Sequence, residues 1–102
     1  MAKFMVAYFG GMVADNPEAR DASMGEWMAW FESLGDAVVQ MGSPFGASGA
    51  VASDGSVSDS RAGLTGYSIV EADGVNEAAQ LVSKCPIFSD GGSMEVYEAL
   101  MM

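Results

Sequence analysis

Hydrophobic residues recur along this chain with two different periods, and these periods predict where helices and strands lie. Between residues 23 and 42 they recur every three or four positions, which is the period of a helix: Met24, Trp27, Met28, Phe31, Leu34, Val38 and Met41. Ser23 and Glu26 form a pattern typical of a helix start, and Gly42 followed by Pro44 is typical of a helix end. We therefore expect one long amphipathic helix over Ser23–Gly42. Its apolar side either belongs wholly to the core or partly lines a ligand cavity.

Three other segments have the patterns of strands. Lys3–Gly10 is apolar on both of its alternating faces, which is typical of a strand covered on both sides. Leu64–Ala72 and Met94–Leu100 show alternating patterns. We expect each of the three to be a strand.

A glycine-rich region separates the long helix from the second of these strands. Within it, Asp54-Gly55 lies between two short stretches and is typical of a tight hairpin. We expect Gly49–Ser53 and Ser56–Asp59 to be short edge segments that turn there. The chain before the long helix, residues 12–22, is expected to form a loop that is either a plain connector or a mobile lid.

A second, shorter helix is expected over residues 74–84. Asp73 is a suitable cap at its start, and Pro86 is expected to end it. Cys85 lies at the end of the apolar stripe of this helix, with no neighbour in the sequence that would lower its pKa. We therefore expect a buried, unreactive cysteine.

The resulting order of elements predicts an α+β fold, the ferredoxin-like βαββαβ plait, as a single domain over residues 1–102. An antiparallel sheet should carry both helices on one face, with the first and third strands central and parallel. The other face would then expose large apolar side chains from the first and last strands. We expect this face to be buried in a homodimer, over about 2,000 Å² or more.

The charge of the chain limits its partners. Fourteen acidic residues against four basic ones give a net charge of −10, which disfavours nucleic acid and anionic lipid surfaces as partners. No apolar run approaches the roughly 18 residues that span a membrane, and residues 1–9 do not have the pattern of a secretory signal. A cytoplasmic location is therefore expected.

The absence of histidine narrows the possible chemistry. It removes the commonest general base and the commonest transition-metal ligand, and a single cysteine cannot form a thiolate metal cage. We expect no metal and no cofactor. Carboxylates and tyrosines remain, and the best-placed carboxylates are Asp36, Glu71 and Glu95. Each is either an acid–base group in an isomerase or lyase, with a pKa raised by desolvation, or simply a solvated surface group.

Four aromatic residues are candidates for a ligand site: Tyr8, Trp30, Phe45 and Tyr67. We expect them to border an apolar cleft between the sheet and the long helix, where tyrosine hydroxyls would orient a small aromatic or carbonyl ligand. The alternative is that all four are ordinary core or interface residues.

Several segments together resemble the YCII-related domain family, which includes DGPF-type proteins. They are the opening KFMVAYFG, the tryptophan-bearing first helix, the GSPFG loop, GYSIVEADGVNEAAQLVSKCPIF and GGSMEVYE. The resemblance covers nearly the whole chain and implies a ferredoxin-like dimeric α+β barrel, in which the sheets of two subunits pack face to face. Family members are mostly small bacterial proteins without an established reaction, and the wider superfamily includes isomerases and monooxygenases of small organic molecules.

The chain departs from this family in two places. Relatives often carry a histidine shortly after the cysteine-proline pair, where this chain has Ile87, and the DGPF tetrapeptide is missing. A catalytic histidine–aspartate pair is therefore impossible here. A small-molecule-binding or structural dimer fits the missing histidine better than an enzyme does, and an isomerase or lyase that uses carboxylates or tyrosines is the alternative.

Overall fold

A computed structural model describes residues 1–11 and 16–100 of the chain. Its strands are β1 (Ala2–Phe9), β2 (Val38–Pro44), β3 (Ala50–Val51), β4 (Val57–Ser58), β5 (Leu64–Ala72) and β6 (Ser93–Ala99). Its helices are α1 (Pro17–Leu34) and α2 (Val75–Leu81), with the short 3₁₀ helices η1 (Gly35–Ala37) and η2 (Pro86–Asp90). No helix in these described parts is long and apolar enough to cross a membrane.

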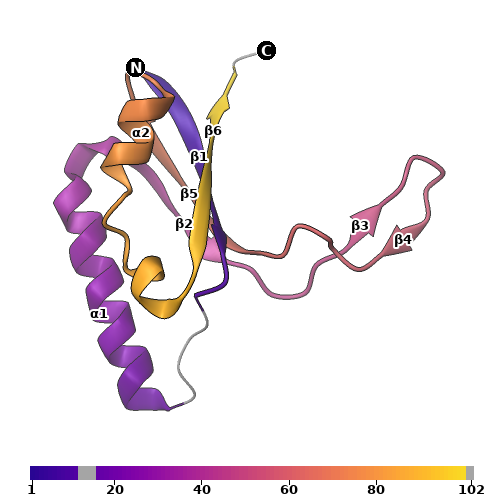
Figure 1. The fold of residues 1–102 in the computed structure, drawn as a ribbon, viewed down its shortest axis with the longest axis horizontal. Coiled ribbons are helices and arrows are strands. Elements are labelled where there is room, and N and C mark those ends of the chain that lie inside the picture. Colours follow the sequence, from indigo (N-terminus) through magenta and orange to yellow (C-terminus); the bar gives the residue numbers. More distant parts are fainter. Residues whose placement is uncertain (12–15, 101–102) are drawn as a thin grey trace.

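Four strands form one sheet in the order β2-β5-β1-β6, and α1 and α2 both cover the same face of it (Figure 1). The predicted α+β plait is confirmed. The first and third strands of the plait, β1 and β5, are central as expected, but they run antiparallel and not parallel. The reason lies in the connections: α1 returns the chain so that β2 runs in the direction of β1, and the turn after β2 then reverses the direction for β5.

The core lies between the sheet and the two helices. Alternate residues of β1 and β5 point into it, because successive side chains of a strand face opposite sides. The buried cluster consists of Phe4, Val6, Tyr8, Trp30, Val70, Ala72, Ala78, Val82, Cys85 and Ile87. Cys85 is buried as predicted, and burial raises the pKa of its thiol to about 11.

Helix α1 begins and ends earlier than the sequence pattern predicts. The Asn16 side chain accepts a hydrogen bond from the Ala19 N–H at 2.7 Å and caps the helix, with proline in its first turn. Ser23 lies inside the helix and is not its cap. Gly35, with a φ of +59°, follows the last helical residue, and the predicted loop over residues 12–22 is helical from Pro17 onward. Residues 12–15 of that predicted loop, and with them this part of the predicted connector or lid, lie outside the described residues.

The segment expected to be the end of the long helix is strand β2. Val38 and Met41 fit the helical period, but β-branched Val38 and Val39 also suit a strand, and pairing with β5 decides the outcome. Gly42 has a φ of +77°, and a Cβ atom there would lie 1.7 Å from the Tyr67 carbonyl oxygen. This glycine therefore permits close approach of β2 to β5, where the pairing register shifts, and is not a helix cap.

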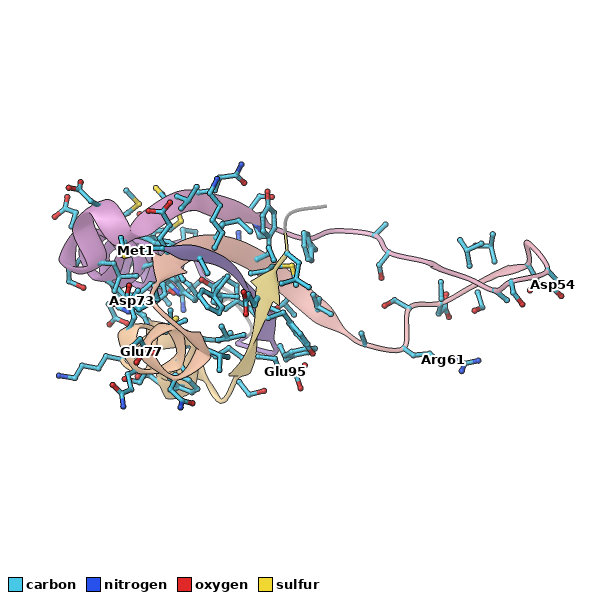
Figure 2. The ribbon with its side chains drawn as sticks, turned by 90° about the horizontal axis from the view of Figure 1, so that it is seen from above. Met1, Asp54, Arg61, Asp73, Glu77 and Glu95 are labelled. Atoms are coloured by element: carbon cyan, nitrogen blue, oxygen red, sulfur yellow. The ribbon has the colours of Figure 1, made fainter. Side chains whose placement is uncertain are left out.

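The predicted hairpin forms, but it is not an edge of the main sheet. Strands β3 and β4 pair only with each other, with Ala50 opposite Ser58 and Val51 opposite Val57. Residues 46–63, called the arm below, project from the sheet on the side away from the helices (Figures 1 and 2). The arm contributes to the 44 Å length of a molecule that is only 18 Å thick.

The last third of the chain largely follows the prediction. Helix α2 is shorter than expected and is preceded by Gly74, which occupies the cap position in place of Asp73. Pro86 begins η2, which brings Ile87 into the core. Strand β6 then lies at the sheet edge beside β1.

Candidate functional site

Tyr8 lies on the helix-covered face of the sheet, in a chain of buried hydrogen bonds. The Ser68 hydroxyl donates to the Met41 carbonyl oxygen at 2.7 Å. Because a serine has one hydroxyl proton, the 2.7 Å bond between Tyr8 Oη and Ser68 Oγ must be donated by Tyr8. Burial raises the pKa of Tyr8 to about 12, and the bond to Ser68 offsets only part of that rise. Tyr8 is therefore a neutral donor that ties β1 to β5 and β2.

Trp30 lies on the same side and belongs to a ring cluster on α1. Trp27 packs its ring edge-on against both Tyr8, at 5.2 Å, and Trp30, at 5.7 Å. Within residues 1–11 and 16–100 the indole Nε1 of Trp30 is a buried donor that has no acceptor. Tyr8 and Trp30 are core residues, Tyr8 on β1 and Trp30 on the buried side of α1.

Phe45 and Tyr67 lie on the opposite face of the sheet. Their rings stack 5.7 Å apart at an angle of 18°, and the Tyr67 hydroxyl donates to Gln40 Oε1 at 3.2 Å. Tyr67 neighbours Ser68 in β5, so their side chains point to opposite faces. The four predicted ligand residues therefore do not border one cleft between the sheet and α1. The structure separates them into two pairs.

The face away from the helices, called the open face below, is defined by the strand register. Tyr67 lies opposite Ala7, which in turn lies opposite Glu95, so these three form a row across the sheet. The next row contains Ile69, Met5 and Tyr97. Phe45 stacks at the edge of the first row, and Gln40 pairs with Ile69 at the edge of the second. The open face thus combines apolar side chains with phenol, amide and carboxylate groups.

Aromatic rings and polar side chains lie close to one another on the open face. Neighbouring strands are about 4.8 Å apart, so the backbones of Tyr67 and Glu95 are roughly 10 Å apart with Ala7 between them. Ala7 is only 1% exposed. The result is a platform onto which a flat ring can stack while polar groups at its border reach the substituents of the ring.

The three predicted carboxylates lie in different surroundings. Asp36 is exposed in η1, after the end of α1. Glu71 is half-buried and lies opposite Lys3 in the register. Glu95 is exposed on the open face (Figure 2) and accepts a hydrogen bond from the Tyr97 hydroxyl, which raises the pKa of that tyrosine. Of the three, Glu95 lies on the platform beside a second acid–base group.

Sequence reasoning missed Tyr97 and Gln40 as members of this surface. The alternation of MEVYE does place Tyr97 on the same strand face as Glu95, so that signal was present. The position of Gln40 could not be read in the same way, since its segment matches the helical period.

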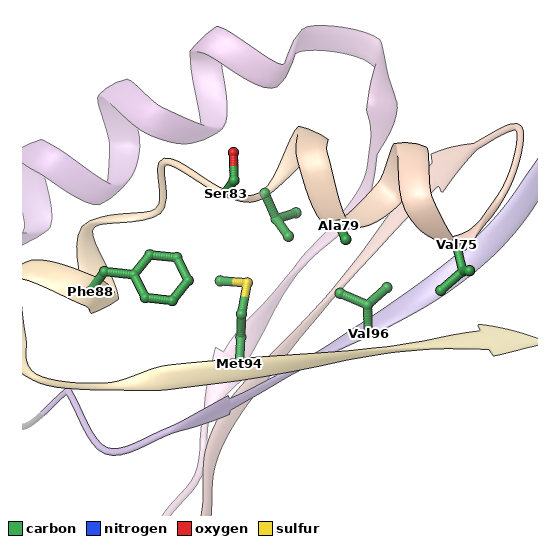
Figure 3. Close-up of a pocket in the computed structure, with 7 residues that line it drawn as sticks. Val75, Ala79, Ser83, Phe88, Met94 and Val96 are labelled. Atoms are coloured by element: carbon green, nitrogen blue, oxygen red, sulfur yellow. The ribbon is translucent and has the colours of Figure 1, made fainter.

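Two apolar grooves lie at the edges of the helix-covered side. The larger, of 370 Å³, runs between α2, η2 and β6, and Figure 3 shows its side chains: Val75, Ala79, Val82, Ser83, Phe88, Met94 and Val96. The smaller, of 230 Å³, lies between α1 and β2 and is lined by Met28, Phe31, Glu32, Gly35, Val38 and Met41. None of the predicted site residues lines either groove. Across the described ranges, no three His, Cys, Asp or Glu side chains gather as a metal site would require.

The fold and its open face define a ferredoxin-like α+β domain, and comparison with known proteins identifies its family. The chain belongs to the YCII-related domain family, whose model matches residues 2–102. No curated protein sequence matches it. Among solved structures it is similar to 5-chloro-2-hydroxyhydroquinone dehydrochlorinase from Burkholderia phenoliruptrix in complex with 2,5-dihydroxybenzoquinone, with a TM-score of 0.58 and 21% identity, over 98% of this chain and 95% of that one. At this identity the similarity shows a shared fold.

Proposed function

We propose that this protein is a homodimeric small-molecule-binding protein that holds a flat aromatic or carbonyl ligand on the open face of its sheet. The observation that carries the proposal is the uncovered apolar surface there. Tyr97 is 52% exposed and Phe45 is 43% exposed, beside the half-buried Met5 and Ile69. Proteins that act as monomers rarely leave such a surface in water, and a second copy would cover it in an interface of about 2,000 Å².

The chemistry of the platform indicates the class of ligand. Apolar rings favour stacking of another ring, while the Tyr67 and Tyr97 hydroxyls, the Gln40 amide and the Glu95 carboxylate offer both donors and acceptors at its border. A ring that carries hydroxyl or carbonyl groups suits this set. The similar dehydrochlorinase was solved with 2,5-dihydroxybenzoquinone, which is a compound of this class and therefore a suitable probe.

Titration with 2,5-dihydroxybenzoquinone in a calorimeter tests this proposal. Tyr67→Phe removes one hydroxyl from the open face and should weaken binding about fivefold, since one hydrogen bond contributes about 1 kcal/mol. Tyr8→Phe makes the same chemical change on the helix-covered face and should leave binding unchanged. Weaker binding in Tyr8→Phe but not in Tyr67→Phe would move the ligand to the other side of the sheet, and no binding by the unmodified protein to this probe or to related ring compounds would defeat the proposal.

A catalytic role is the second candidate, and the Tyr97–Glu95 pair is the observation that favours it. A lyase or isomerase needs a group that takes a proton from a ring substrate, and Glu95 is the carboxylate on the platform. Asp36, at the end of α1, has no such position.

Chloride release from 5-chloro-2-hydroxyhydroquinone, the compound named for the similar enzyme, tests this candidate. If the protein turns it over, Glu95→Gln should lower kcat at least about a hundredfold, as expected for loss of a general base. Asp36→Asn is the matched control and should keep full activity. Equal rates in both variants would exclude Glu95 as the base.

A further inference from the structure

We infer that the arm of each subunit clasps the other subunit, with Val51 and Val57 seated in the groove between α2 and β6 of the partner. The inference rests on the proposed homodimer and adds to it a specific contact. It commits to a second copy of this chain as the occupant of the groove. Three observations carry it: the exposure of the arm, its direction and reach, and the character of the groove.

The main packing partner of each arm strand, among the described residues, is the other arm strand. Within the described residues, β3 and β4 contact each other and neither packs substantially against a helix or a main-sheet strand. Val51 and Val57 lie opposite each other in the hairpin and are 72% and 73% exposed. Two β-branched apolar side chains at the same level of a projecting hairpin are a surface that another molecule can cover.

The direction and length of the arm fit a partner seated on the open face. The arm leaves the sheet on the side opposite α1 and α2, which is the side of the open face (Figures 1 and 2). Sheets that pack face to face lie about 10 Å apart. Val51 lies seven residues beyond Pro44, a span of up to about 23 Å in extended chain. The valines can therefore pass the partner's sheet and reach the level between that sheet and its helices.

The groove at the β6 edge is the better of the two grooves for this contact. β6 pairs with β1 in an unbroken register, whereas the pairing of β2 with β5 is interrupted twice. A regular edge strand presents unpaired backbone groups and is the kind of edge that proteins cover, while bulges protect an edge. The β6 groove is also the larger, and two of its lining residues, Val75 and Phe88, are 50% and 47% exposed (Figure 3).

Chemical cross-linking distinguishes the two grooves. In a Cys85→Ala background, which removes the native thiol, Val57→Cys is combined with Ala79→Cys in the β6 groove. The matched control combines Val57→Cys with Glu32→Cys in the β2 groove. A short bis-maleimide reagent should convert most of the first variant into a dimer-sized band on a denaturing gel and leave the control monomeric. Cross-linking of the control in place of the first variant would overturn the inference.

A second variant tests the contact without cross-linking. Val51→Asp with Val57→Asp changes only exposed side chains, so the subunit should fold normally by circular dichroism. The dimer dissociation constant, measured by sedimentation, should rise at least about tenfold. An unchanged dissociation constant would refute the clasp while the homodimer stands, whereas a monomeric unmodified protein would remove the homodimer and the clasp together.

Discussion

At the scale of single residues, the buried side chains of Tyr8 and Cys85 make the folded protein less stable at alkaline pH. Burial raises the pKa of Tyr8 from 10.0 to about 12 and that of Cys85 from 9.0 to about 11, because an anion is poorly solvated in the core. The unfolded chain therefore releases these protons at a lower pH than the folded protein does. The stability contributed is complete below about pH 9 and is lost as the pH rises to 12.

Urea unfolding at pH 8, 10 and 11.5 measures this loss. We expect a decrease in the free energy of unfolding on the order of 2–3 kcal/mol for each group. Tyr8→Phe should remove the part of the decrease that falls between pH 10 and 12, and Cys85→Ala the part between 9 and 11. Identical pH profiles for Tyr8→Phe and the unmodified protein would show that this tyrosine is not responsible.

At the scale of elements, the start of α1 offers a direct test of the structure against the sequence pattern. The structure gives the cap to Asn16, whereas the sequence pattern gave it to Ser23. Asn16→Ala should lower the free energy of unfolding by about 1 kcal/mol, because the Ala19 N–H loses its acceptor. Ser23→Ala lies inside the helix and should be neutral or slightly stabilising, since alanine is the better helix former. The reverse order of the two effects would contradict the helix start described here.

The elements that sequence patterns predict well are those with only one interpretation. Leu64–Ala72 was predicted with its observed bounds, because its alternating pattern continues until Asp73-Gly74 interrupts it. The end of α1 was not, because Val38 and Met41 fit the helical period while the β-branched Val38 and Val39 also suit a strand, and only pairing with β5 decides between the two. Long-range contacts of this kind leave no trace in a local pattern.

The candidate site was harder to predict than the fold for a related reason. Tyr8 and Tyr67 both lie in segments that the sequence pattern predicts as strands, yet they face opposite sides of the sheet. A local pattern shows which residues of one strand share a face. It does not show which residues of different strands lie on the same face of the sheet. That information is in the register, where Ala7 and not Tyr8 lies beside Tyr67.

At the scale of the whole molecule, we expect two subunits to associate through the open face. Ile69→Asp places a charge in the middle of that face and should convert the proposed homodimer to a monomer in sedimentation equilibrium, because burying an unpaired carboxylate is unfavourable. Ala29→Asp adds the same charge at an exposed position of α1 and should leave the dimer intact. A dimer that survives Ile69→Asp would mean that subunits associate through another surface.

The arm begins and ends at one point of the sheet, and this has a consequence for how the domain can vary. Pro44 lies opposite Gly66, and the Phe45 N–H donates to the Thr65 carbonyl oxygen at 3.0 Å, so the chain leaves and re-enters β2 and β5 as neighbours. The arm is therefore an insertion between β2 and β5, which a two-residue turn could otherwise join as a hairpin. Lengthening such an insertion costs little entropy. Related chains can therefore gain, shorten or lose an arm without altering the four-stranded sheet. The length of the arm can change during evolution while the fold stays the same.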